Sequence, residues 1–393
     1  MKLNHIKNIL SKICIWVQNE IKKASGISLI HNSSVSVLSE DGAIELFLEE
    51  ERLSRLKHDS DPFHVCNMVL GGLTMDEIEK YEIGTSSLIS KDKLGVSTLD
   101  RSSDLLMMYV AKTLKLPPHE QNSFKYERVK EKFEKFFDHH LFHAYCGFYN
   151  SGFDDAVVVV VDGMGNFTSP AEDRHEVVSI FDASYPFNMN PLGGMSTPSY
   201  DSCDESEHKG EWTCGIGMAY SAVSSYMGFG GLGAGTVMGL SPYGREDPNI
   251  RSFLADGFNV DSNLFYRTKH GCNFIPYDYL PHYREATNTE DYFEKLANLA
   301  WRLQEDFQTH MLKILLDALA ISKRKNIILT GGCALNCVAN YWYLDKLPKG
   351  VKLYVEPISN DAGVSIGISK AQHYSKTGSM KKHPLKTLYL GPE

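Results

Sequence analysis

Two histidines four residues apart are the first candidates for chemistry in this sequence. On a helix, side chains at this spacing project from one face, so the imidazoles of His139 and His143 could hold one metal ion. Asp361, at an expected strand-to-helix turn, is a candidate third ligand, because two histidines and one carboxylate leave positions open for a substrate oxygen. The same spacing is also common on helices that bind no metal, and His140 leaves open which imidazole points inward.

Glycines that follow two strand-like runs indicate phosphate binding. Gly331 and Gly332 come after the apolar run 326–329 and before an expected helix. Glycine lets the backbone approach an anion closely, and the N-terminus of a following helix offers unpaired N–H groups. Asp162 and Gly163 follow a run of valines in the same way, and a carboxylate there could hold a metal-bound water or a ribose hydroxyl. Taken singly, each pair also fits an ordinary tight turn.

A framework of buried strands and helices must position these groups. Residues 157–161 are all valine, which is typical of a central strand covered on both faces. Residues 290–321 carry apolar side chains at helical spacing and predict a long helix. Further apolar runs of strand length are 27–38, 43–48, 326–329 and 351–355. The first two of these runs flank the turn at Asp41-Gly42 and predict a β-hairpin. The pattern predicts an α/β protein.

Other segments have weaker patterns. Residues 76–137 are charged and compatible with helix, whereas 184–212, which are rich in Pro, Ser, Gly and Asp, predict a long loop. Residues 230–244 contain too many glycines for a helix interior. The run 49–58 mixes dense charge of both signs, which is typical of a solvated helix end.

Length, composition and charge limit the possible classes of protein. At 393 residues, with 42% hydrophobic and 23% charged side chains, the chain is globular and too long for one ordinary core, so we expect two lobes with a cleft between them. The formal net charge of -9 argues against general binding to nucleic-acid phosphates. The 8 cysteines contain no C-x-x-C pair, which predicts reduced thiols, no disulfides and a cytoplasmic location.

Residues 1–24 predict an amphipathic helical extension. Apolar residues recur there at helical spacing, but charges such as Lys12 and Glu20 interrupt the run. The run is therefore too short for the core of a signal sequence or for a membrane span. Such a helix could pack on the same protein, or touch a membrane surface or a partner.

Seven segments, taken in order, resemble the N-terminal domain of the O-carbamoyltransferases that modify Nod factors and aminoglycoside antibiotics. They are the hairpin with His31, the run 50–58, His139 to Ala144, Asp162-Gly163, 238–244, 331–337 and 359–363. The resemblance covers about Ser25 to Glu393. It implies a two-lobed nucleotide-binding α/β fold with a central cleft, like that of actin, hexokinase and the enzymes of tRNA threonylcarbamoyl transfer.

The resemblance also implies how the reaction is catalysed. A divalent metal, iron in such enzymes, is expected to be held by His139, His143 and Asp361. His31 matches an active-site histidine of the family, and Lys57 matches a basic residue near the reacting group. A metal and a cation would polarise the carbamoyl carbonyl, a nearby base would take the proton of the acceptor, and AMP would leave as a stabilised anion.

The donor implied by the resemblance is carbamoyl-adenylate, made from ATP and carbamoyl phosphate. Its nucleotide part is expected near Gly331, Gly332 and Asn336. We also predict a cofactor-binding role for Gly163 and a catalytic role for Asp162. The acceptor is a hydroxyl on a sugar, an antibiotic or a hydroxymethyl-pyrimidine nucleotide.

Two departures from the family pattern affect these expectations. The family has a lysine near Thr236, so a phosphate contact from that position is not expected here. Family members also carry a C-terminal domain that makes the adenylate, whereas this sequence stops near where that domain would begin. We therefore predict an extension over residues 1–24, a catalytic domain over 25–388 and the start of a linker over 389–393. The adenylate would come from a C-terminal or separate domain, and a homodimer is compatible with the sequence.

Two other functions remain as alternatives. Threonylcarbamoyl transfer to tRNA would use the same fold and metal, although the acidic balance and the Glu50-Glu51-Arg52 signature favour the O-carbamoyl branch. A nucleotide-binding regulatory module without catalysis would share the architecture of heat-shock ATPases. The presence of both histidines and of Asp361 argues against the non-catalytic module. A metal analysis of the purified protein would distinguish such a module from a metal-dependent enzyme.

Overall fold

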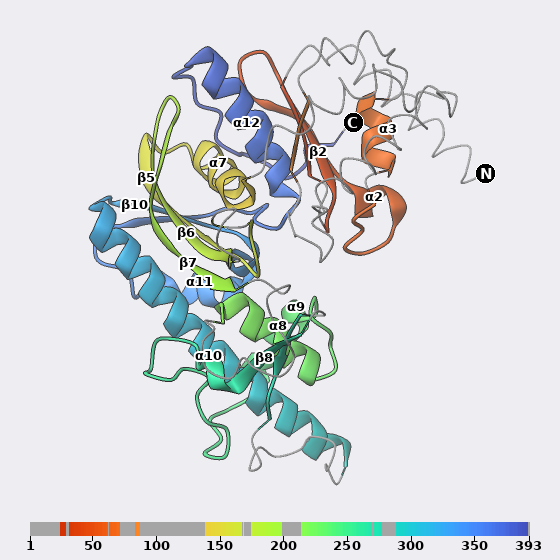
Figure 1. Cartoon of the computed structure of the whole chain (residues 1–393), viewed down its shortest axis with the longest axis vertical. Helices are drawn as coiled ribbons and strands as arrows, with labels where there is room; N and C mark the ends of the chain where they lie inside the picture. The colour runs from red at the N-terminus through yellow and green to blue at the C-terminus, as the bar shows by residue number, and fades with distance from the viewer. Residues whose placement is uncertain are drawn as a thin grey trace, which may run out of the picture. The chain divides into compact units, whose positions relative to one another are not determined.

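The chain divides into two compact units in the computed structural model shown in Figure 1. The first unit comprises residues 1–158, 182–190 and 356–393, and the second comprises residues 159–181 and 191–355. The residues that the structure describes are 24–28, 31–61, 63–70, 83–86, 138–166, 168, 174–198, 214–268, 271–276 and 288–391. The extension predicted over residues 1–24 lies outside the described residues, apart from Ala24.

The first unit is built on a four-stranded sheet with the order β3-β2-β1-β4. Its strands are β1 (Ser25–Ser28), β2 (Ser34–Leu38), β3 (Ile44–Glu49) and β4 (Ile83–Ser86). β2 pairs with β1 and β3 in antiparallel fashion, whereas β4 runs parallel to β1. The β2–β3 pair is the predicted hairpin, but the run 27–38, which we expected to be one strand, is divided between the antiparallel strands β1 and β2. β4 is a strand inside a segment that we expected to be compatible with helix, and for these four residues that expectation is wrong, because pairing with β1 decides their conformation.

Two helices of the first unit contact each other closely because glycine is placed where they meet. α7 (His139–Ser151) contacts α12 (Gly363–Thr377), and Figure 1 shows the two helices side by side. A Cβ atom at Gly367 would lie 1.9 Å from the carbonyl oxygen of Phe142, so a side chain does not fit between these helices. α12 also contacts β1 and β2, so the helix pair is anchored to the sheet.

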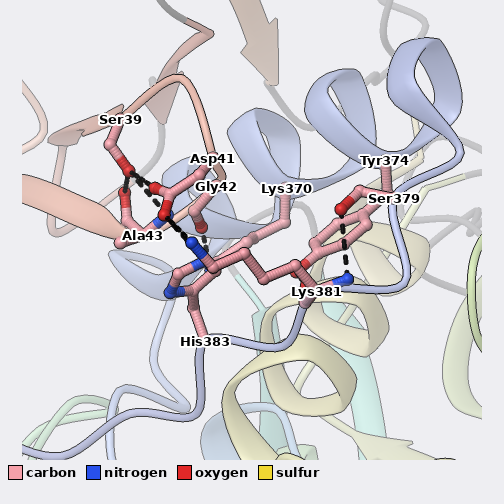
Figure 2. Close-up of polar contacts among 9 residues, drawn as sticks. All are labelled: Ser39, Asp41, Gly42, Ala43, Lys370, Tyr374, Ser379, Lys381 and His383. Carbon is pink, nitrogen blue, oxygen red and sulfur yellow. Dashed lines mark hydrogen bonds and ion pairs between the residues drawn. The ribbon is translucent and has the colours of Figure 1, made fainter.

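The segment after α12 runs back along the first unit. Figure 2 shows Lys381 of this segment paired with Asp41, which lies in the turn of the hairpin. In the same view the buried ammonium of Lys370 donates to the carbonyl of Gly42 at 2.7 Å. Further along, Leu390 packs on the core and its carbonyl accepts a backbone hydrogen bond from β3. Leu390 therefore takes part in the packing of the first unit, and the linker expected to begin at residues 389–393 stays a prediction.

The second sheet has five strands in the order β11-β10-β5-β6-β7. Its strands are β5 (Asp155–Val161), β6 (Arg174–Ser184), β7 (Asn188–Pro198), β10 (Asn326–Thr330) and β11 (Lys352–Val355). Read from its other edge, the order of this sheet is β7-β6-β5-β10-β11. Three consecutive strands thus stand in reverse order and are followed by strands from later in the chain. The first sheet, β3-β2-β1-β4, has the same arrangement. The repetition fits the two-lobed, actin-like and hexokinase-like fold that the resemblance implies, and the predicted α/β fold class is confirmed.

The second unit also contains four of the α-helices that the structure describes. They are α8 (Ile216–Tyr226), α9 (Ala234–Leu240), α10 (Thr289–Ser322) and α11 (Cys337–Tyr343), with single 3-10 turns at Ser241–Tyr243, Ser262–Leu264 and Gly332–Leu335 and a small hairpin of β8 (Phe265–Thr268) and β9 (Gly271–Phe274). α10 agrees with the predicted long helix, and it starts where the side chain of Asn288 accepts hydrogen bonds from two N–H groups of the first turn. No helix among the described residues is long and apolar enough to cross a membrane.

Two segments that we expected to be irregular are partly regular. β7 lies inside the predicted loop 184–212, and residues 190–194 of it are exposed at the edge of the sheet, where serine, glycine and proline are tolerated. α9 lies inside the segment 230–244, where we expected too much glycine for a helix. It contacts α10 and buries Val237, so tertiary packing offsets the low helix propensity of its glycines.

Candidate functional site

Three predicted metal ligands meet in the first unit. His139 and His143 lie near the start of α7, and both side chains are fully buried. Their Nε2 atoms are 3.2 Å apart, with the ring planes at 88° to each other. Oδ1 of Asp361 lies 3.5 Å from each of these nitrogens. The structure thus selects His139 and His143 as the pair that faces Asp361.

The packing of α12 on α7 brings Asp361 to the two histidines. The turn before α12 is closed by a hydrogen bond from the N–H of Ile358 to Oε1 of Glu356, at 3.0 Å. At Gly363 a Cβ atom would lie 2.0 Å from the carbonyl oxygen of Ile358, so the turn folds tightly against the start of the helix. Asp361 lies between these two points and is 3% exposed, which fixes its carboxylate inside the unit.

The three side chains fit a divalent metal ion. Ligand atoms about 2.1 Å from a metal are separated from one another by about 3.0–3.4 Å in tetrahedral or octahedral geometry. The separations of 3.2 and 3.5 Å are close to these values, and all the ligand atoms lie within 4.8 Å of one another. Two imidazoles with one carboxylate also form the donor set of a facial metal site.

Electrostatics keep the central carboxyl group ionised. Burial by itself would raise the pKa of Asp361, but the imidazoles of His139, His143 and His31 act in the opposite direction and hold that pKa well below its usual range. A buried carboxylate that stays ionised is suited to bind a cation and to accept hydrogen bonds from imidazole.

His31 faces the other oxygen of the same carboxylate. Its Nε2 lies 3.3 Å from Oδ2 of Asp361, and its side chain is 47% exposed. Asp361 therefore divides its oxygens between two buried histidines and one histidine that solvent or a substrate can reach. The structure brings the predicted catalytic histidine together with the three predicted metal ligands.

The charged run 49–58 is more buried than we expected from its composition. Glu50, the first residue of α2 (Glu50–Ser54), is 1% exposed and accepts hydrogen bonds from the backbone N–H groups of His64 and Val65, at 3.1 and 2.8 Å. It thereby caps α3 (Phe63–Leu70). The prediction of a solvated helix end is wrong for Glu50, because a helix that starts 13 residues later supplies partners for the carboxylate.

Lys57 lies in the loop between α2 and α3. Its side chain is exposed, and no hydrogen bond or ion pair joins it to another residue that the structure describes. Burial lowers the pKa of the neighbouring His58, and Lys57 and His31 act in the same direction, whereas Glu51 acts in the opposite direction. Lys57 and His31 are thus both near His58, although they are far apart in sequence.

Four further predicted residues meet in the second unit. Gly331, at the end of β10, has a φ of 87°, and a Cβ atom there would lie 2.4 Å from the carbonyl oxygen of Val161 at the end of β5. Directly after β5, Oδ1 of Asp162 accepts hydrogen bonds from the N–H of Gly163 at 2.7 Å and of Gly332 at 3.2 Å. Asp162 therefore links the two glycine turns that the sequence indicated separately.

Asn336 has a structural role in the second unit. Its Oδ1 accepts from the N–H of Ala339 at 3.0 Å, which caps α11, and from Nε2 of Gln304 at 3.1 Å. Its Nδ2 donates to Oε1 of Gln304 at 2.9 Å. Both polar atoms of the amide are thus bonded within the protein, and the predicted contact with a nucleotide stays a prediction. Thr236, where we expected no phosphate contact, is exposed on α9.

Comparison of the sequence with known proteins identifies a family and several relatives. Residues 23–369 match the profile of a family described as carbamoyltransferase N-terminus. The nodulation protein NolNO of Sinorhizobium fredii is 24% identical over 390 residues, which cover 94% of this chain and 52% of that protein. An uncharacterized protein of Synechocystis sp. is 25% identical over 404 residues, which cover 93% of this chain and 60% of that protein. The chain thus spans little more than half the length of these relatives.

Solved structures show a more distant likeness. Full-length HypF, in a phosphate- and nucleotide-bound form, has a TM-score of 0.45 and 12% sequence identity, with 89% of this chain and 55% of that chain covered. HypF of T. kodakarensis has a TM-score of 0.47 and 10% identity, with 90% of this chain and 48% of that chain covered.

Proposed function

The chain belongs to the carbamoyltransferase N-terminus family, and from that premise we propose that it transfers a carbamoyl group from carbamoyl-adenylate to an acceptor hydroxyl. One observation carries the proposal beyond the family. Three imidazoles converge on the two oxygens of a single buried carboxylate, that of Asp361. One oxygen faces a pair of buried metal-type ligands, and the other faces a histidine that a substrate can reach.

The buried pair and the carboxylate supply the metal site of the proposal. His139, His143 and Asp361 would hold a divalent ion, for which we propose iron(II), and this ion would polarise a carbonyl oxygen as a Lewis acid. The three side chains need no rearrangement to present their ligand atoms toward one another.

His31 is the proposed general base. Because its Nε2 faces an ionised carboxylate at 3.3 Å, the tautomer with the proton on Nε2 is favoured, and Nδ1 is left to accept the proton of the acceptor hydroxyl. The acceptor oxygen forms a bond to the carbamoyl carbon while the bond from that carbon to the phosphate oxygen breaks, and AMP leaves as an anion. The ammonium of Lys57 is proposed to offset the charge that develops during this step.

The nucleotide part of the donor is assigned to the glycine turns of the second unit. Gly331 and Gly332 have no side chains, and glycine allows a phosphate to approach the backbone closely. Asp162 is the candidate acceptor for a ribose hydroxyl. Synthesis of the adenylate from ATP and carbamoyl phosphate is assigned to a C-terminal or separate domain, a proposal supported by the greater length of the relatives.

Transfer from supplied carbamoyl-adenylate tests the function. The metal-loaded chain is incubated with the adenylate and a panel of sugars, aminoglycosides and hydroxymethyl-pyrimidine nucleotides, and products are identified by mass spectrometry. We expect AMP release together with a mass gain of one carbamoyl group on a hydroxyl of the acceptor. Absence of AMP release from the metal-loaded chain with every acceptor, and with water alone, would contradict the proposal.

A further inference from the structure

Glu51 joins two loops that are far apart in sequence. One loop, residues 31–33, connects β1 to β2, and the other, residues 55–61, connects α2 to α3. Oε2 of Glu51 accepts a hydrogen bond from Nδ2 of Asn32 and another from the backbone N–H of His58, both at 3.0 Å. The Glu51 side chain is 15% exposed, so this carboxylate lies inside the loop pair instead of in bulk solvent.

Other hydrogen bonds join the same two loops. Nδ1 of His58 lies 3.1 Å from Oδ1 of Asn32, so the two side chains that contact Glu51 also contact each other. The N–H of Ser33 donates to the carbonyl of Asp59, and the Ser33 hydroxyl donates to the carbonyl of Ser60, each at 3.0 Å. The two loops are thus cross-linked along their length, and Glu51 is the charged member of the network.

The two residues that Glu51 contacts have an unusual backbone conformation. Asn32 has a φ of 63° and His58 a φ of 58°, in the left-handed region that side chains other than glycine rarely adopt. Such conformations persist where the surroundings over-determine them, and they are common at functional sites. Each of them directly adjoins a residue of the proposed reaction, since His31 precedes Asn32 and Lys57 precedes His58.

We infer that Glu51 is a positioning residue that fixes His31 and Lys57 together, through Asn32 and His58. The inference rests on the proposed function, because that function gives His31 and Lys57 their roles. Neither residue has its own anchor in a regular element, since both lie in loops. His31 must keep its Nε2 at 3.3 Å from Oδ2 of Asp361, and the hydrogen bonds of Asn32 hold the backbone from which that side chain projects.

Hydrogen exchange tests whether Glu51 orders both loops. We expect Glu51→Ala to raise deuterium uptake in peptides that cover residues 31–34 and in peptides that cover 55–61, because both hydrogen bonds to the carboxylate are lost. Glu51→Gln keeps an acceptor oxygen and should restore much of the protection. Glu40→Gln, at an exposed position near the hairpin turn, is the matched control and should change neither peptide. A change in only one loop, or in neither, would overturn the inference.

A double-mutant cycle tests whether Glu51 acts through His31. The measured rate is AMP release from carbamoyl-adenylate with water as the acceptor, so no acceptor needs to be known. Glu51→Ala should lower kcat about tenfold with little change in KM and no loss of metal, as is typical when an outer partner of a reacting group is removed. In the His31→Asn background the same substitution should lower kcat much less.

The outcomes separate this inference from the proposed function. An active wild-type chain in which Glu51→Ala costs the same factor with and without His31→Asn would show that Glu51 does not act through His31. A metal-loaded wild-type chain that releases no AMP would instead contradict the proposed function, and with it the part assigned to Glu51 in transfer.

Discussion

The two sheets share one strand order, yet the groups that gather beside them differ in kind. In the first unit three imidazoles surround one carboxylate, that of Asp361, and all four groups are side chains. In the second unit the carboxylate of Asp162 accepts from two backbone N–H groups, and its neighbours Gly163 and Gly332 have no side chains. One region is defined by what its side chains offer, and the other by where side chains are absent.

This difference determines how each region can be damaged. A site made of side chains fails when one ligand atom is removed, even if the backbone stays in place. A turn made of glycines fails when an atom is added, because a Cβ at Gly331 would collide with the backbone carbonyl of Val161 on the neighbouring strand. Substitutions of these two kinds therefore test the comparison directly.

The largest effect is expected for the buried histidines. His139→Ala and His143→Ala should each reduce bound metal from about one ion per chain to near zero, because two remaining ligands hold a divalent ion weakly. His140→Ala is the matched control, since His140 is equally buried but its ring does not join the pair that faces Asp361. Elemental analysis of the purified variants measures the outcome. Equal metal content in all three variants and the wild type would show that this is not a metal site.

The second effect is expected at the exposed side of the same carboxylate. His31→Asn keeps a polar side chain of similar size but removes the titrating nitrogen, so AMP release from carbamoyl-adenylate should fall by about a hundredfold, as expected for the loss of an acid–base group. Metal content should stay at the wild-type value, because His31 faces Oδ2 and the pair faces Oδ1. A joint loss of metal and activity would mean that His31 supports the metal ligands instead of acting on the proton.

How well the sequence predicted this molecule depended on whether the signal was local. The helical spacing of His139 and His143 is local, and the structure places both on one face of α7. Their meeting with Asp361 depends on contact between α7 and α12, which residue spacing alone does not encode; the ordered motifs of the family resemblance supplied it. The α/β class followed from apolar runs, four of which appear as single strands close to their predicted limits, whereas the run 27–38 is divided between β1 and β2.

The features that the sequence did not predict depend on residues that are far apart in the chain. Glu51 was not singled out, because its partner Asn32 is 19 residues away. Asparagine and histidine tolerate the left-handed backbone that Asn32 and His58 adopt, but that tolerance does not indicate which group they contact. β7 and α9 were expected to be irregular, because glycine, serine and proline have low propensity for regular structure, whereas pairing with a sheet edge and packing on α10 decided their conformation.

A third effect is expected in the glycine turns of the second unit. Gly331→Ala should lower the free energy of unfolding by about 2 kcal/mol, because alanine is strained at a positive φ and its Cβ would lie 2.4 Å from a backbone oxygen. Gly163→Ala is the matched control in the same turn region, where a Cβ atom meets nothing within 4 Å, and it should change stability by less than about 0.5 kcal/mol. Urea denaturation of both variants measures the difference, and equal stability would remove the contrast between the two regions.

The smallest effect is expected for a glycine of the same unit whose backbone conformation and surroundings do not require glycine. Gly235 lies in α9, has no positive φ, and a Cβ atom there would meet nothing within 4 Å. Glycine in a helix loses more backbone entropy on folding than alanine does, so Gly235→Ala should raise the free energy of unfolding by about 0.5 kcal/mol, opposite in sign to Gly331→Ala. The same urea experiment measures it. A clear loss of stability instead would show that α9 needs glycine for a close contact, as the turn at Gly331 does.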